Sequence, residues 1–344
     1  MSRRAASMTQ SRTSSEAGGT RMRQFVLAAV AAAAVPAPAE TSKTTSSAGA
    51  ARRAGASGPV VRQTSGSPAA SPVPPSVLRT WVENAARSVS AYYGRTPGPA
   101  RVVVLRGARA AVGQGVTRRG DVPTIRIALG PATTAADLET DWVLTHEMVH
   151  TAFPLLREHS WLSEGVAVYV EPIARAKVGF APPENVWRWL VWGLPKGLPD
   201  GNDHGLDSAD SWGRTYWGGA LFCFLADVEI RRATGNRRSL GDALRGIHET
   251  VGGLESDAEI EEVLAAGDRA VGHPVLRELY AQLGKAPGTV SLLQLFGLLG
   301  VEGSGANLRF DDSAPYAAIR AAIATDMRPG APSRTSDVSG RPGP

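Results

Sequence analysis

Residues 145–150 read THEMVH, and the five residues from His146 to His150 decide how the chain is organised. On an α-helix, residues four apart differ by about 40° in azimuth and about 6 Å in height. His146 and His150 would therefore project from one helix face, where two imidazoles can share one metal ion. Glu147 lies roughly 100° around the helix from His146, close enough to act on a water molecule at that metal.

A catalytic zinc ion uses three protein ligands and keeps a fourth position for water, so one ligand is missing from this pair. The acids and histidines that follow closely are Glu158, His159, Glu164 and Glu171. Glu164 stands in the apolar stretch WLSEGVAVYVEP (161–172), where a buried carboxylate is costly unless it is paired or binds a metal. We therefore predict one Zn²⁺ per chain, bound by the two histidines and Glu164.

The other candidates have different predicted roles. Glu171 follows Glu164 by about two helical turns, so it falls on the same face. We predict that it accepts a hydrogen bond from the second ring nitrogen of a ligating histidine. His159 is the weaker candidate because it stands in the short polar link REHS before the second helix begins.

The pair of segments HEMVH and WLSEGVAVYVE resembles the gluzincin zinc metallopeptidases, in particular the aminopeptidase-N and glycyl-aminopeptidase families. Their second helix reads W-L-N-E-G-x-x-x-Y-x-E, and Ser163 stands here where Asn is usual. Thirteen residues separate His150 from Glu164, where those aminopeptidases usually have about 18. The shorter link leaves the exact family within the gluzincins open.

The segment RTYWGG (214–219) resembles a second part of those families. There, a tyrosine closely followed by glycine opens a helix, and its phenol stabilises the oxyanion. The resemblance implies this role for Tyr216, and implies that Glu147 is the general base. The alternative for Tyr216 is an aromatic side chain that packs at a helix start. Gly218 and Gly219 would permit close backbone approach.

These features predict a metallopeptidase that hydrolyses peptide bonds by a Glu147-activated water. The alternative is a non-catalytic envelope protein that keeps the gluzincin fold to bind a peptide or a cell-wall partner. The aminopeptidase-N segment G-x-M-E-N, whose acid holds a free amine, has no counterpart before His146. Its absence favours an endopeptidase, or an exopeptidase with a different anchor.

The first 39 residues predict export. Arg21 and Arg23 precede the apolar run Phe25–Val35, and small residues follow at Ala37–Ala39, as in a cleaved signal peptide. The run is short for a membrane span, so none is expected after cleavage, although an uncleaved anchor is the alternative. We expect a secreted, periplasmic or envelope protein.

Charge and cysteine content exclude other classes of protein. Residues 1–39 contain five arginines and one glutamate, which carry +4 of the formal net charge of +5. The remainder is nearly neutral, so no nucleic-acid partner is expected. Cys223 is the single cysteine, which excludes an intrachain disulfide and a multi-cysteine metal site. Its apolar neighbours predict that it is buried. Composition predicts nothing about oligomeric state.

The expected fold class is α+β, with a small mixed sheet packed on the zinc-binding helices and a mainly helical second half. We predict strands at 101–105 and 124–129, with a loop between them, and one helix from Thr133 or Thr134 to Phe153. The strand at 124–129 is either the edge that pairs with a substrate or an internal strand. The predicted divisions are a signal peptide at 1–39, a disordered linker at 40–75, a zinc-binding subdomain at 76–180, a helical subdomain at 181–327 and a disordered tail at 328–344.

The loop at 198–212 is rich in aspartate, which could indicate a calcium site. The acids lack the spacing of an EF-hand loop, so a solvated loop beside the cleft is the favoured interpretation.

Overall fold

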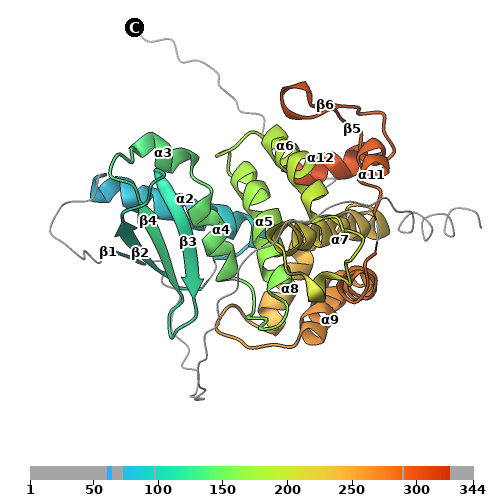
Figure 1. Cartoon of the computed structure of the whole chain (residues 1–344), viewed down its shortest axis with the longest axis horizontal. Helices are drawn as coiled ribbons and strands as arrows, with labels where there is room; N and C mark the ends of the chain where they lie inside the picture. Colours follow the sequence, from blue (N-terminus) through green and yellow to red (C-terminus); the bar gives the residue numbers. More distant parts are fainter. Residues whose placement is uncertain (1–59, 64–72, 97, 289, 326–344) are drawn as a thin grey trace, which may run out of the picture.

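The computed structural model of the chain describes residues 60–63, 73–96, 98–288 and 290–325. The predicted signal peptide and C-terminal tail lie outside these residues, as does most of the predicted linker. The fold is α+β, as predicted: a small four-stranded sheet lies at one side, and the remainder is mainly helical, with one further two-stranded sheet (Figure 1). No helix in the described ranges is long and apolar enough to cross a membrane.

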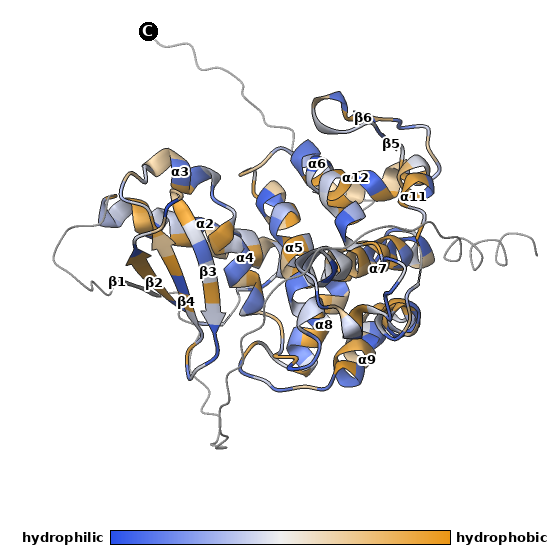
Figure 2. Cartoon of the chain, in the orientation of Figure 1, coloured by the Kyte–Doolittle hydropathy of each residue, from blue (hydrophilic) through white to orange (hydrophobic). Residues whose placement is uncertain are grey.

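The elements of the sheet-containing half are β1 (Val60–Gln63), α2 (Pro75–Tyr93), β2 (Arg101–Arg106), β3 (Val112–Arg118), β4 (Thr124–Leu129), α3 (Ala135–Thr140), α4 (Val143–His150) and α5 (Ser160–Lys177). The elements that follow are α6 (Pro183–Gly193), η1 (Leu194–Gly197), η2 (Leu206–Ser208), η3 (Gly213–Gly218), α7 (Gly219–Thr234), α8 (Leu240–Thr250), α9 (Ile260–Val271), α10 (Val275–Leu279), η4 (Tyr280–Gly284), α11 (Leu292–Leu299), β5 (Val301–Glu302), η5 (Gly305–Asn307), β6 (Arg309–Phe310) and α12 (Ala317–Thr325). Hydrophobic and hydrophilic residues are interleaved along α5, α8 and α9 (Figure 2).

The sheet has the strand order β1-β2-β4-β3, with β3 antiparallel to β4 and the other pairs parallel. One prediction was wrong here, because the segment expected to be a loop forms β3. Strand β4 is internal, which is the second of the two alternatives for 124–129, and β3 lies at one edge of the sheet. The glycines of β3 lower its strand propensity, and pairing with β4 overrides that weakness. In addition, β1 lies inside the predicted linker.

The predicted helix to Phe153 is two helices, and Asp141 is the physical cause. Thr134 forms a capping box with Asp137 at the start of α3, which confirms the predicted N-cap. At Asp141 the backbone turns to an extended conformation (ψ 138°), and its carboxylate accepts hydrogen bonds from the N–H groups of Val143 and Leu144. An acid that satisfies these free N–H groups starts a second helix. The same carboxylate accepts a hydrogen bond from the Trp81 indole of α2.

Helices α5 and α7 cross where two glycines meet. A Cβ on Gly165 would lie 2.2 Å from the carbonyl carbon of Gly219, and a Cβ on Gly219 would lie 1.9 Å from the Trp161 carbonyl oxygen. Only glycine permits this backbone approach. The expectation of close approach at Gly219 is therefore confirmed.

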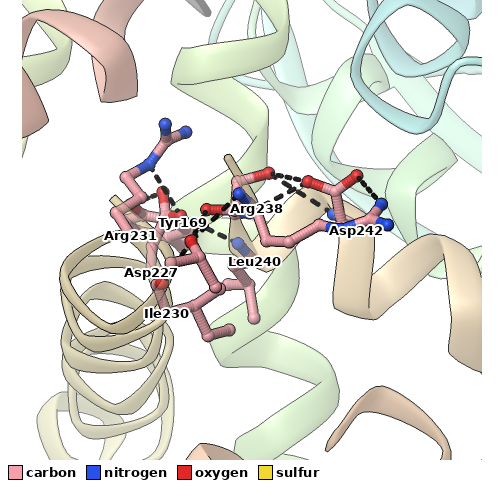
Figure 3. A network of polar contacts seen from close by, with 9 residues as sticks. Tyr169, Asp227, Ile230, Arg231, Arg238, Leu240 and Asp242 are labelled. Carbon is pink, nitrogen blue, oxygen red and sulfur yellow. Dashed lines mark hydrogen bonds and ion pairs between the residues drawn. The ribbon is translucent and has the colours of Figure 1, made fainter. Parts of the chain in front are cut away.

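A buried polar network fixes the same helices farther along (Figure 3). Asp227 of α7 accepts hydrogen bonds from the Tyr169 hydroxyl of α5, from Arg231 Nε and from the N–H of Leu240 at the start of α8. These hydrogen bonds offset part of the cost of burying the carboxylate. Cys223 is buried in α7, as predicted, and burial raises the pKa of its thiol.

Candidate metal centre

His146 and His150 of α4 face Glu164 of α5. The Nε2 atoms of the two histidines lie 3.4 and 3.6 Å from Glu164 Oε2. One ligand atom from each residue lies within 4.8 Å of the other two, and no other cluster of three such residues occurs in the described part of the chain. The structure therefore brings together the three predicted ligands.

Glu164 Oε2 is buried, yet it has no hydrogen-bond partner among the described residues. Such an oxygen is costly unless a cation or proton donor satisfies it. Burial alone would raise the pKa of Glu164, but the imidazoles of His146 and His150 hold that pKa at about 2. Two imidazole nitrogens and an ionised carboxylate form a donor set that zinc accepts, so the residues present fit a zinc ion.

Strand β3 holds the side chain of Glu147. The Thr117 hydroxyl lies 2.6 Å from Glu147 Oε2 and 2.8 Å from the Glu147 backbone oxygen. A hydroxyl has one proton, so it donates to one of these oxygens at a time. A Cβ on Gly115 would lie 2.3 Å from Glu147 Cγ, so this position has no room for a side chain. The sequence prediction missed both residues, although their spacing of two places them on one face of a strand.

Tyr216 lies near enough to Glu164 and Glu147 for both carboxylates to influence its phenol. It belongs to the π-helical turn η3 that precedes α7, a local form that is frequent at functional sites. Burial and the neighbouring carboxylates of Glu164 and Glu147 raise the pKa of its phenol to about 12. The Trp212 ring stacks on the Tyr216 ring, with 5.6 Å between centroids.

Glu171 is not the partner of His146. Its Oε1 accepts a hydrogen bond from Arg175 Nη1 at 3.0 Å, whereas His146 Nδ1 is buried without a partner among the described residues. The predicted contact was wrong for His146 because Glu171 and Glu164 share one face of α5 but lie at different heights along its axis. Two turns separate Glu171 from Glu164 by about 10 Å along the axis of α5.

The remaining candidates have structural contacts. His159 Nδ1 lies 2.8 Å from Asp207 Oδ1, and Asp207 also accepts hydrogen bonds from Trp161 and Tyr280. Asp203 pairs with Arg214 at 2.6 Å. Asp203 and Asp207 therefore bind side chains of the protein, which the solvated-loop interpretation did not predict. The acidic loop forms no ion-binding cluster in the part of the chain that is described.

Comparison with known proteins finds solved structures that resemble part of the chain. No protein-family model and no curated protein matches the chain. A two-domain M1 zinc metallopeptidase mutant bound to L-tryptophan is similar in structure, with 17% identity, a TM-score of 0.43, and coverage of 65% of this chain and 48% of that one. A mutant M1 zinc metallopeptidase from Deinococcus radiodurans bound to a Tyr-Ser-Ala substrate has 16% identity, a TM-score of 0.41, and coverage of 65% and 47%. The chain spans about half the length of these two structures.

Proposed function

We propose that this protein is a zinc-dependent peptidase whose ligands are His146, His150 and Glu164. One observation carries the proposal: three ligand atoms lie within 4.8 Å of one another, beside Glu147. The buried Oε2 of Glu164, which accepts no hydrogen bond within the described residues, supports a bound cation at this point.

A zinc ion bound here would polarise a carbonyl group and make a bound water more acidic. Glu147 takes a proton from the attacking water and delivers it to the leaving amine, and Thr117 orients its carboxylate for both transfers. The phenol of Tyr216 stays protonated at neutral pH and donates a hydrogen bond to the carbonyl oxygen as negative charge develops there.

The test uses the purified full chain with quenched fluorescent peptides. We expect about one zinc per chain by elemental analysis and hydrolysis that a chelator abolishes. Glu147→Gln should retain zinc and lose activity by about 10²- to 10⁴-fold, the usual contribution of a general base. Glu158→Gln is the matched control, because Glu158 is exposed and lies outside the metal cluster. A folded protein that stays zinc-free in the presence of zinc would overturn the proposal.

The non-catalytic alternative gives a different result in the same assay. A zinc-loaded protein that binds peptides but cleaves none of a broad library would favour it. The presence of Glu147 beside the candidate ligands, in contact with Thr117, supports the catalytic function over the non-catalytic one.

The position of cleavage is a separate part of the proposal. We propose an endopeptidase, since no counterpart of the G-x-M-E-N segment precedes His146. One peptide series with free and blocked N-termini decides the matter. Equal rates for both forms would support internal cleavage, and activity only on the free form would contradict it.

Export is also proposed, on the pattern of residues 1–39. Production of the full chain in a bacterial host, followed by mass spectrometry of its N-terminus, tests it. Recovery outside the cytoplasm, with cleavage after Ala39, is the expected result. An intact N-terminus on a membrane-bound product would indicate the uncleaved anchor.

A further inference from the structure

Three tryptophans near the metal centre have large exposed fractions. Trp142, Trp192 and Trp212 are 44%, 54% and 56% exposed, and they are half of the large hydrophobic residues that the described ranges leave exposed. Single exposed apolar residues are common on soluble proteins, whereas a group of them beside a site indicates a binding surface.

Trp142 joins this surface to the metal ligands. It precedes His146 by four residues and His150 by eight, so the three side chains form one stripe on the same side of α4. The Trp142 and His146 rings meet edge to face, with 5.8 Å between centroids. A molecule that contacts Trp142 therefore lies next to the metal.

Two tryptophans of α6 extend the surface away from the metal. The Trp189 ring lies 6.1 Å from the Trp142 ring, and Trp192 stacks on Trp189 at 5.1 Å. We call Trp142, Trp189 and Trp192 the tryptophan arm. Trp189 Nε1 is buried, and no polar group within the described ranges forms a hydrogen bond with it.

The charge beside the tryptophan arm determines which kind of side chain it can bind. Tryptophan faces attract cations in general. Here, however, Lys196 Nζ already lies over the Trp192 ring and makes the far end of the arm positive. A substrate lysine or arginine would be repelled there, whereas an aromatic or large aliphatic side chain would bury apolar area without that penalty.

We propose that the tryptophan arm is a specificity subsite, which binds an aromatic or large aliphatic side chain of the peptide next to the scissile bond. The inference rests on the proposed peptidase function and names its substrate class. Trp142 makes the contact nearest the metal, and Trp189 and Trp192 lengthen the apolar surface for larger side chains.

The experiment compares quenched peptides that differ at one residue, with Phe, Leu, Ala or Lys at each position flanking the cleaved bond. The wild-type protein should show the highest kcat/KM for Phe or Leu on one side of the bond. Trp142→Ala should lower kcat/KM about tenfold for those peptides, the order expected for one aromatic contact. The loss should be smaller for the Ala peptides, and Trp142→Phe should recover part of the loss for the Phe and Leu peptides. Leu293→Ala removes an 85% exposed apolar side chain from α11 and should change none of these values.

Zinc content and thermal stability of each variant separate a subsite from a structural role. An equal loss on all peptides in Trp142→Ala, or no apolar preference in the wild type, would overturn the inference and leave the peptidase function intact. If no peptide is cleaved, binding of labelled Phe and Ala peptides to the full chain remains measurable. Tighter binding of the Phe peptide that Trp142→Ala abolishes would then support the subsite, although the peptidase function had failed.

Discussion

At the scale of single residues, the candidate base is held by the strand beside its helix. Glu147 contacts Thr117, and Gly115 leaves the space for its side chain. The HExxH spacing and the apolar setting of Glu164 were sufficient to predict the cluster of His146, His150 and Glu164 that the structure brings together. The roles of Thr117 and Gly115 could not be predicted, because they depend on β3, whose glycine-rich sequence does not indicate a strand.

The Thr117 hydroxyl should matter for turnover and little for metal binding. Thr117→Val keeps the side-chain volume but removes the hydrogen bond to Glu147, so kcat should fall about tenfold or more through misplacement of the carboxylate. Thr117→Ser keeps the hydroxyl and should restore most of the rate. Steady-state kinetics with zinc analysis measures the effect. A normal kcat in the valine variant would show that Glu147 needs no such support.

Glu171 should make stability depend on pH. Burial raises its pKa from 4.5 to about 7, and the neighbouring Arg175 offsets only part of this effect. The folded state then binds the proton more tightly than the unfolded state does. The free energy of unfolding should therefore fall by about 3 kcal/mol as the pH rises from about 4.5 to about 7.

Urea unfolding at pH 5 and pH 8 measures this dependence. Glu171→Gln carries no titrating group, so it should lose most of the difference between the two pH values. Glu158→Gln, at an exposed position, should behave like the wild type. An unchanged pH slope in Glu171→Gln would place the dependence elsewhere.

At the scale of elements, two local breaks in regular structure position the site. Asp141 divides a predicted helix in two. Helix α4 then begins directly after Trp142, and the side chains of Trp142 and of the two histidines lie on one side of it. The π-helical turn η3 carries Tyr216 ahead of α7 and near Glu164 and Glu147. Helical periodicity predicted that helices occur in both segments. It could not predict either break, because one depends on a side-chain cap and the other on tertiary packing.

The glycine crossing of α5 and α7 should not tolerate a methyl group. Gly165→Ala would place a Cβ 2.2 Å from the Gly219 carbonyl carbon, so the helices must separate. We expect a loss of about 1–3 kcal/mol in unfolding free energy, as for other overpacked sites. Because Glu164 adjoins the contact, zinc affinity should fall as well.

Gly297→Ala is the matched control for that change. Gly297 lies inside α11, and a Cβ added to it would meet no atom of the described residues within 4 Å. Alanine there should be neutral or stabilise the protein by about 0.5–1 kcal/mol. Chemical denaturation of both variants gives the comparison. Equal stability of the two variants would mean that the crossing relaxes without cost.

At the scale of the whole molecule, one hydrophobic core joins the sheet-containing half to the helical half. It includes residues from Leu78 of α2 to Ile323 of α12. Helix α4 packs between β3 and α5, so the three candidate ligands lie between the sheet and the helices that follow it (Figure 1). The fold class was predictable from the order of periodic segments. The position of β1, across the predicted linker, was not, since its pairing with β2 joins distant parts of the chain.

Metal binding should therefore stabilise the entire fold. Zinc at about 1,000 times its dissociation constant adds about 4 kcal/mol to the free energy of unfolding if it binds only the folded state. Thermal scans with zinc and with chelator should show a higher Tm for the metal-loaded wild type and for Glu158→Gln. Glu164→Gln should lose most of the shift, since it lacks the anionic ligand. A metal-independent Tm in the wild type would contradict the assignment.

Helix α4 is short, and its length bears on whether the chain folds before it binds a metal ion. Its eight residues are too few to form a stable helix in isolation. We therefore expect the two histidines to reach a common face only when Asp141 is bonded to Trp81 and β3 packs against α4. We therefore expect the chain to complete its tertiary structure before a metal ion can bind, so that zinc would bind the folded protein and would not nucleate its folding.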